Sequence, residues 1–313
     1  MQNNQSKKLA QGAMMIALFT VLMAIIFYVP LAGFIAMLIA PLPIIWYSAT
    51  YDRKSSLLVT FIAVIITFFI GGLIILPASL IFAAAGMAIG DAIYNKKSKV
   101  FMFISTSIVL LITFAIQYLI SLRLFEFDFI NDSLVMVRKS YEESLNLVEK
   151  MTGQTPISKE ALADMFSMLE MTIPASITLA VFVFAFVFIS INLPIVKRFK
   201  VDVPKFSSFS NLRLPKAVLW YYLITLTINL FIQPELGTSL YVVMINVSLI
   251  LWILLTLQGI SVIHFALDTF GLPKMLKVLS TIVAIPLYSF VILLGIIDLG
   301  FNIREYIQAK KQK

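Results

Sequence analysis

The sequence predicts an all-α protein, a polytopic bundle of transmembrane helices with eight or nine spans and a cytoplasmic N-terminus. Three observations predict this class. Hydrophobic residues make up 60% of the 313 residues and charged residues only 13%, against about 25% charged residues in a typical soluble domain. Several apolar runs approach the roughly 20 residues that a helix needs to cross a bilayer. Lysine and arginine gather mainly between these runs.

Nine apolar segments are the predicted spans. The first follows Lys7 and Lys8 but lacks the small-residue cleavage site of a signal peptide, so we expect a retained helix. The segments are residues 9–29, 31–48, 55–70, 73–94, 100–121, 173–195, 217–232, 239–264 and 275–299.

The basic residues indicate the orientation, because short cytoplasmic loops keep Lys and Arg while long translocated segments are largely exempt from this rule. With the N-terminus inside, the long loop 122–172, with nine acidic and five basic residues, falls outside. The basic clusters then all fall inside, at Lys7, Lys8, Arg53, Lys54, Lys96, Lys97, Lys99, Lys197, Arg198, Lys200, Lys205, Arg213 and Lys216.

The last third does not fit nine spans as well. Nine crossings would place the tail, with Arg304 and three lysines up to Lys313, outside, which contradicts the same rule. Either one of the last three segments does not cross or the tail is an exception. Segment 217–232 is short and is followed by Pro234, so it is the weakest candidate. Eight and nine spans both stay open.

The segments group into three parts. Residues 1–197 are expected to form a six-helix bundle with the outer loop 122–172. Residues 198–216 form a basic cytoplasmic linker, and residues 217–313 form two or three further spans and a basic tail.

The outer loop has helical periodicity. Apolar residues from Ile130 to Val148 recur at helical spacing among charged ones, which is typical of an amphipathic helix. A second amphipathic helix is expected after Pro156, with Ser158 as its cap. Such helices either lie on the bilayer surface or cover a cavity.

Polar side chains inside the predicted spans recur on single helix faces. Because a polar stripe facing lipid is costly, these faces should point into the bundle. They either line a cavity or form hydrogen bonds between helices, which are worth about 0.6 kcal/mol per pair on average. The candidates are Thr113, Gln117, Asn229, Gln258, Ser261, His264 and Asp268.

Two pairs of charged or titratable residues lie near the ends of predicted spans. His264 and Asp268 form an i, i+4 pair that either titrates near neutral pH or serves as an interfacial cap beside Gly271. Asp298 and Arg304 are the remaining candidates. On a continuous helix Arg304 points away from Asp298, so their pairing requires a distorted helix or other partners.

Small residues at a spacing of four mark close helix packing. Ala13 and Ala17 form one such pair, and Gly86 and Gly90 form another. This spacing lets two helix backbones approach each other. We expect these pairs to serve packing between helices of the chain; docking of a partner helix is the alternative.

The composition argues against an enzyme. The chain has no Cys and a single His, and it lacks a nucleophile elbow, an H-E-x-x-H motif and a P-loop. We therefore expect no catalytic residue, no metal site and no cofactor, and we do not expect nucleic acid as a partner.

A resemblance follows from short C-terminal motifs. Gln258-Gly259, then Gly295-Ile296-Ile297-Asp298 and Phe301-Asn302-Ile303-Arg304, resemble the YybS family of bacterial membrane proteins over nearly the whole chain. This resemblance implies a multi-pass protein of the bacterial plasma membrane and brings no biochemical activity with it.

Residues 1–197 are also similar to the S components of energy-coupling factor transporters, six-helix proteins with both ends in the cytoplasm. Their first helix often carries an Ala-x-x-x-Ala pair that packs on a membrane coupling subunit, and Ala13 and Ala17 stand at that place. This resemblance implies a coupling subunit and ATPases as partners. The chain departs from it by continuing for over 110 residues beyond the sixth helix and by lacking a recognisable vitamin or metal signature.

Two functions fit these observations. The first is a small-molecule transport subunit without its own ATPase, because no ATP-binding motif is present. The second is a membrane scaffold or regulatory protein, whose basic linker recruits a cytosolic partner or anionic lipid; juxtamembrane bases attract anionic headgroups at about 1 kcal/mol each.

Overall fold

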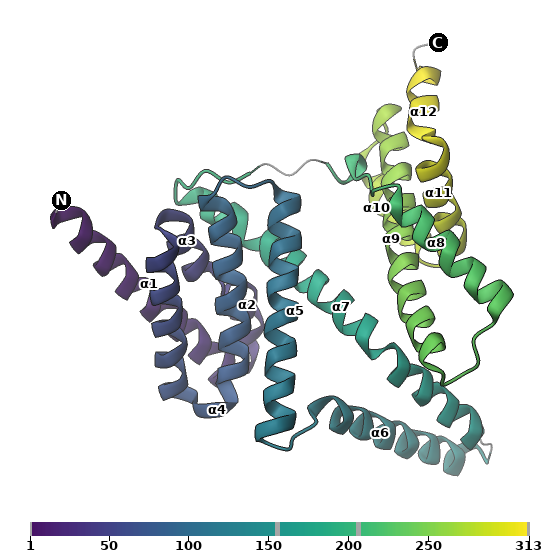
Figure 1. Cartoon of the computed structure of the whole chain (residues 1–313), viewed down its shortest axis with the longest axis horizontal. Helices are drawn as coiled ribbons and strands as arrows, with labels where there is room; N and C mark the ends of the chain where they lie inside the picture. Colours follow the sequence, from purple (N-terminus) through teal and green to yellow (C-terminus); the bar gives the residue numbers. More distant parts are fainter. Residues whose placement is uncertain (1, 154–156, 205–207, 312–313) are drawn as a thin grey trace. The chain divides into compact units, whose positions relative to one another are not determined.

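The computed structural model describes residues 2–153, 157–204 and 208–311, and within these ranges the chain forms helices and no strand (Figure 1). The all-α prediction is therefore confirmed. By length and composition, six of the described helices can cross a membrane, or seven if one bent pair counts as a single span. The predicted eight or nine spans and the orientation stay predictions.

The chain divides into two compact units. Unit 1 comprises Met1–Leu147 and Thr178–Lys205, and unit 2 comprises Val148–Ile177 and Phe206–Lys313. This division differs from the predicted one, because residues 148–177 group with the C-terminal part and not with the first bundle. Of the predicted basic positions, Lys205 and Lys313 lie outside the described residues.

Seven helices contribute to unit 1 in whole or in part. Proline begins α2 and lies in the first turn of α3, where its missing N–H costs nothing. The helices are α1 (Gln2–Tyr28), α2 (Pro30–Ile39), α3 (Leu42–Thr50), α4 (Arg53–Tyr94), α5 (Lys99–Leu124), α6 (Phe129–Thr152) and α7 (Lys159–Arg198).

Helix α4 folds back on itself at Gly72. This residue has φ 63° and ψ −153°, a conformation that glycine adopts readily because it has no Cβ. Arg53 Nε and Asp91 Oδ1, near the two ends of α4, are 4.0 Å apart, whereas a straight helix would separate these residues by roughly 57 Å. Figure 1 shows the reversal. Helix α4 therefore carries the two predicted segments 55–70 and 73–94.

The start of α4 is fixed by its cap. The carboxylate of Asp52 accepts a hydrogen bond from the Ser55 N–H at 3.2 Å and pairs with the ammonium group of Lys8 on α1. The hydrogen bond from Lys8 is the main reason why the pKa of Asp52 is lowered to about 2. This contact ties the beginning of α1 to the turn before α4.

The small-residue pairs occupy different environments. A Cβ on Gly86 would lie 2.8 Å from the Pro41 carbonyl oxygen, and one on Gly90 would lie 2.7 Å from that of Ile45. These glycines thus allow α3 and α4 to touch through their backbones. Ala13 and Ala17 are exposed on α1.

The outer loop forms α6 and the beginning of α7. Helix α6 is amphipathic, as predicted, and buries none of its residues. Ser158 accepts a hydrogen bond from the Ala161 N–H at 3.2 Å, as the cap at the start of α7. The second predicted loop helix is not separate, because α7 continues for 40 residues through segment 173–195. Residues 170–172, between the predicted amphipathic helix and segment 173–195, include no glycine or proline that would end the helix.

The rest of unit 2 is built around α9. The elements are the 3₁₀ turn η1 (Phe209–Asn211), α8 (Ala217–Thr227), the π-helix η2 (Ile228–Ile232), α9 (Ser239–Thr269), α10 (Lys274–Ala284), α11 (Tyr288–Phe301) and α12 (Ile303–Lys311).

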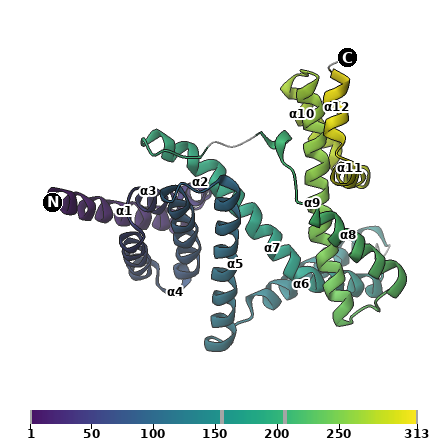
Figure 2. The ribbon, with the colours of Figure 1, turned by 45° about the horizontal axis from the view of Figure 1, so that its top comes forward.

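The last predicted span, 275–299, is not one straight helix. Helices α10 and α11 are bent against each other by 112°. Pro286 stands between them, and proline excludes a continuous helix because it lacks an N–H and clashes with the preceding turn. Both Figures 1 and 2 show α10 and α12 beside the same end of α9.

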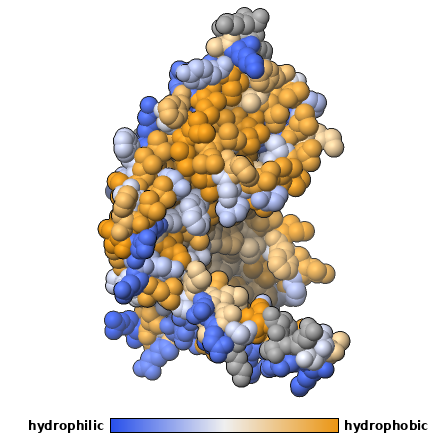
Figure 3. Space-filling model, turned by 90° about the vertical axis from the view of Figure 1, so that its right-hand side faces the viewer, coloured by the Kyte–Doolittle hydropathy of each residue, from blue (hydrophilic) through white to orange (hydrophobic). Residues whose placement is uncertain are grey.

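Large apolar side chains cover much of the surface. Trp220, Phe231 and Phe290, for example, are each more than 60% exposed. The face drawn in Figure 3 carries a broad hydrophobic area. Contiguous apolar surfaces of this kind are rare on soluble monomers, and here they suit contact with lipid.

Candidate functional site

A buried ionic network lies against the C-terminal half of α9. Arg304 is 1% exposed and Asp298 is 5% exposed, and Arg304 Nε donates to Asp298 Oδ2 at 3.1 Å. The side-chain amide of Gln258 donates to the same carboxylate oxygen at 2.6 Å. We call Gln258, Ser261, Asp298 and Arg304 the Arg304 network.

The ion pair forms because the helix is interrupted between its two members. Asn302 is left-handed, with φ 54° and ψ 50°, and ends α11; asparagine tolerates this conformation better than most residues. Helix α12 then starts at Ile303. The pairing that a continuous helix would prevent is therefore present, through the distortion that the sequence analysis required.

Two glycines bring α9 and α11 together behind the network. A Cβ on Gly259 would lie 2.0 Å from the Val291 carbonyl oxygen, and one on Gly295 would lie 2.2 Å from that of Leu255. The two helices thus touch backbone to backbone. This contact places Gln258, next to Gly259, within hydrogen-bonding distance of Asp298, three residues after Gly295.

The network also binds the backbone of the linker. The guanidinium group of Arg304 donates to the carbonyl oxygens of Ser210 at 2.6 Å and Leu212 at 2.8 Å, and to the Ser261 hydroxyl at 3.0 Å. Gln258 Oε1 accepts from the Leu214 N–H at 2.9 Å. Residues 209–214 are therefore held by side chains of α9 and α12.

In the part of the chain that the structure describes, the ion pair leaves one polar atom of the network without a hydrogen bond. The guanidinium carbon of Arg304 also lies 5.2 Å from the ring centroid of Phe265, which favours a cation. Within the described residues, Asp298 Oδ1 has no hydrogen-bond partner. Buried ion pairs inside a membrane protein are functional candidates, and breaking one of them leaves an uncompensated charge.

His264 and Asp268 each pair with α10. His264 Nε2 lies 2.9 Å from the Thr281 hydroxyl oxygen and 3.1 Å from the Lys277 carbonyl oxygen. Asp268 forms an ion pair with Lys277. His264 and Asp268 thus each bond to a residue of α10. Both residues hold α10 against the end of α9.

The two candidates on α5 each bond to a backbone carbonyl oxygen, one on the same helix and one on α4. The Thr113 hydroxyl donates to the Val109 carbonyl oxygen at 2.8 Å, and Gln117 Nε2 donates to the Pro77 carbonyl oxygen at 3.2 Å. Gln117 therefore links α5 to the second half of α4. The described structure brings neither residue into a pocket with the other candidates.

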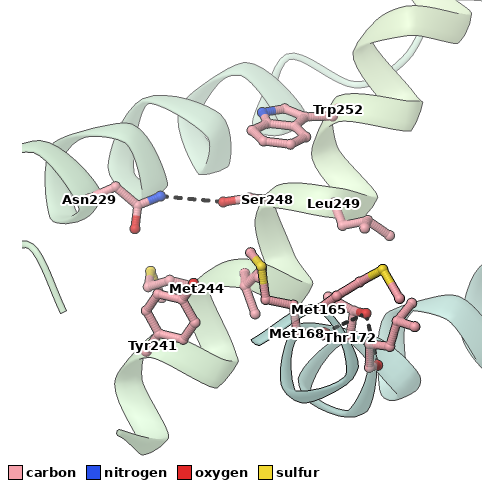
Figure 4. A pocket seen from close by; sticks show the side chains of 11 residues that line it. Met165, Met168, Thr172, Asn229, Tyr241, Met244, Ser248, Leu249 and Trp252 are labelled. Carbon is pink, nitrogen blue, oxygen red and sulfur yellow. Dashed lines mark hydrogen bonds between the residues drawn. The ribbon is translucent and has the colours of Figure 1, made fainter. Parts of the chain in front are cut away.

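A second feature of unit 2 is a pocket of about 570 Å³, which we call the α7–α9 pocket. This volume lies in the range of small-molecule sites, roughly 300–1,000 Å³. Side chains of α7, η2 and α9 point into it, as Figure 4 shows. Its lining residues, none of them charged, are Met165, Met168, Leu169, Thr172, Asn229, Tyr241, Met244, Ile245, Ser248, Leu249 and Trp252.

The pocket lies beside an interruption in the hydrogen bonding of α7 that the sequence analysis missed. Asn246 of α9 donates to the Met171 carbonyl oxygen at 2.6 Å and accepts from the Ala175 N–H at 2.8 Å. A regular helix would join these two backbone groups directly. Asn246 therefore inserts its amide into α7 next to Pro174. A lone asparagine within an apolar run was the available signal.

A second helix irregularity contributes Asn229. This residue belongs to η2, a π-helix that ends at the left-handed Gln233. Asn229 Nδ2 lies 3.4 Å from the Ser248 hydroxyl oxygen of α9. Single π-helical turns occur frequently at functional sites. The irregular segments at Pro174 and at η2 therefore both adjoin the pocket.

The helices, the lipid-facing surface and the buried polar network define a multi-pass helical membrane protein. The chain belongs to the family described as predicted membrane protein, DUF2232, which matches residues 17–299. It is 26% identical to the uncharacterized protein YybS of Bacillus subtilis (strain 168), and the similarity covers 97% of this chain and 99% of that protein. The resemblance to the YybS family is confirmed. No solved structure matches the chain.

Proposed function

We propose that the chain is a small-molecule transport subunit of the bacterial plasma membrane that receives its ligand in the α7–α9 pocket. One observation carries this proposal: the pocket adjoins both the Asn246 insertion into α7 and the π-helix η2. Helix segments with irregular hydrogen bonding occur frequently at functional sites, and polar side chains inside membrane helices commonly mark substrate pathways.

The proposed subunit depends on other proteins for energy and catalyses no reaction itself. The sequence contains no P-loop. The exposed Ala13 and Ala17 on α1 support docking of a membrane coupling subunit with its ATPases, since small residues let a partner helix approach closely. In this proposal unit 1 provides the docking face and unit 2 the ligand pocket.

The test is to purify the tagged full-length protein from its native membrane into nanodiscs and identify bound molecules by mass spectrometry. We expect a bound small molecule in the wild type and its loss in Met244→Trp, which fills the pocket. Val243→Trp is the matched control, because Val243 precedes Met244 and is 51% exposed outside the lining. Equal recovery from both variants, or none from the wild type, would contradict the proposal.

A scaffold is the second candidate function, and the linker supports it. Lys197, Arg198, Lys200, Arg213 and Lys216 are all exposed, and residues 209–214 are fixed by the Arg304 network. Exposed basic residues of this kind suit a cytosolic partner or anionic lipid, and Arg213 lies within the fixed residues.

The scaffold predicts loss of such a partner when Lys197, Arg198 and Lys200 are replaced by Gln. Affinity purification in mild detergent separates the two functions. Recovery of an ATPase pair with a coupling subunit supports transport, and recovery of a cytosolic protein that the triple Gln variant loses supports the scaffold.

A further inference from the structure

We propose that the ligand of the α7–α9 pocket is an uncharged amphiphile, with an apolar body and one hydrogen-bonding group such as a hydroxyl or a primary amide. This inference rests on the proposed function and specifies its substrate class.

The lining excludes a charged ligand. The lining contains no Asp, Glu, Lys, Arg or His side chain. An ionised group transferred from water into such surroundings would lose its hydration without gaining a counterion. The ligand must therefore be neutral along the part that the pocket encloses.

The body of the ligand is apolar. Methionine side chains of α7 and α9 face each other across the pocket, with Trp252 and Tyr241 beside them (Figure 4). Methionine adapts its shape to irregular apolar groups, and aromatic side chains offer flat contact surfaces. This combination suits a flexible chain or a flat ring system.

The polar group of the ligand is placed by Asn229 and Ser248. Their nitrogen–oxygen distance of 3.4 Å is longer than the usual 2.7–3.2 Å of an N–H···O bond. Both side chains therefore retain capacity for a better partner. The Thr172 hydroxyl donates to the carbonyl oxygens of Met168 and Leu169, so toward a ligand it offers lone pairs. A group that both donates and accepts can therefore bond to Asn229 and Ser248 together.

The experiment uses Trp252 as a contact reporter. The chain has three tryptophans, so the full-length Trp46→Phe/Trp220→Phe variant in nanodiscs retains Trp252 alone. Its probes are an ω-bromoalkyl alcohol, carboxylate, ammonium salt and plain bromoalkane of one chain length, since bromine quenches tryptophan on contact. We expect saturable quenching by the alcohol and at least about tenfold weaker binding of both ions, given the cost of burying an unpaired charge.

Asn229→Leu tests the polar group. We expect it to remove the preference for the alcohol over the bromoalkane. The control is Thr227→Val, in the adjacent turn, because the Thr227 hydroxyl already donates to the Leu223 carbonyl oxygen and lies outside the lining.

The outcomes separate the two proposals. If an ion binds as tightly as the alcohol, or if Asn229→Leu keeps the preference, the ligand class is wrong while the pocket remains a ligand site. If no probe quenches Trp252 saturably, the proposed function fails as well. The bilayer itself could supply the occupant, and brominated phospholipid in the nanodisc tests this. The control is a variant that retains only Trp220. Stronger quenching of Trp252 than of Trp220 would show bilayer lipid in the pocket and overturn the inference.

Discussion

Arg304 Nε lies 3.1 Å from Asp298 Oδ2, although the two residues are six positions apart. The left-handed Asn302 between them turns the chain so that α12 presents Arg304 to the end of α11. The same guanidinium group binds two carbonyl oxygens of the linker. One side chain near the C-terminus thus connects α9, α11 and residues 209–214.

Arg304→Leu should strongly destabilise unit 2, because Asp298 would remain buried without a counterion. Removal of one partner of a buried pair costs about 3–5 kcal/mol. Arg304→Lys should rescue little, since an ammonium group cannot reproduce the fork of donors. Thermal unfolding in detergent measures the effect. Arg138→Leu is the control, because Arg138 pairs with Glu142 on the exposed face of α6; equal losses in both variants would refute the assigned role.

Gly259→Ala and Gly295→Ala should each separate α9 from α11. The added Cβ would meet a carbonyl oxygen at 2.0 Å or 2.2 Å, and overpacking of this kind typically costs about 1–3 kcal/mol. Gly300→Ala on α11 should be tolerated, because the nearest atom to its Cβ would be 3.8 Å away. Thermal unfolding of the three variants checks the ranking, and an unchanged melting temperature in Gly259→Ala would show that the helices pack otherwise.

Asn246→Leu should loosen the contact between α7 and α9. The substitution leaves the Met171 carbonyl oxygen and the Ala175 N–H without the side chain that binds them, and an unsatisfied buried group costs about 1–3 kcal/mol. We expect faster hydrogen exchange around Ala175. Asn131→Leu on α6 serves as the control, since the Asn131 side chain is exposed, and equal exchange in both variants would be the contrary result.

The linker and the tail should lie on the same side of the membrane. Arg304 holds α12 against the backbone of residues 209–214, so the tail emerges where the linker does. The chain has no native cysteine, which permits single-cysteine labelling with a membrane-impermeant reagent. Arg213→Cys and Lys310→Cys should react from one side and Leu236→Cys from the other. Labelling of Arg213→Cys and Lys310→Cys from opposite sides would contradict this topology.

The pairing of Lys8 with Asp52 should make stability depend on acid pH. Because the pKa of Asp52 falls from 3.8 to about 2 in the folded protein, the pairing contributes fully above the unfolded value and is lost as pH falls toward about 2. Asp52 is 47% exposed, so the contribution is small and salt-sensitive. The melting temperatures of wild type and Asp52→Asn should converge as the pH falls from 3.8 to about 2. A difference that stays constant over this pH range would contradict the assigned pairing.

Much of the architecture is visible in the sequence. Hydropathy predicts the segments that α4, α5 and α9 contain, including the two halves of α4, because lipid demands long apolar runs. Helical spacing also selects Gln258 and Ser261 as neighbours on one face. Spacing alone, however, cannot show that Asn302 leaves the helix, and the Asp298–Arg304 pair depends on that one residue.

The pocket is less visible in the sequence. Its lining comes from elements far apart in the chain, and Asn246 belongs to no polar stripe because its partners are backbone atoms of α7. Methionine and leucine at helical spacing also indicate only a packed core. Asn229 is the one pocket residue that the polar stripes predict. The bend at Pro286, in contrast, had a direct signal in the sequence.

Helix α9 is continuous from Ser239 to Thr269, and its two halves have different neighbours. Ser248 forms part of the pocket wall and Gln258 binds the Leu214 N–H; ten residues of helix separate them by about 15 Å. The wall of the pocket and the anchor of the linker therefore belong to one uninterrupted element, so that two features assembled from distant parts of the sequence share a single helical support.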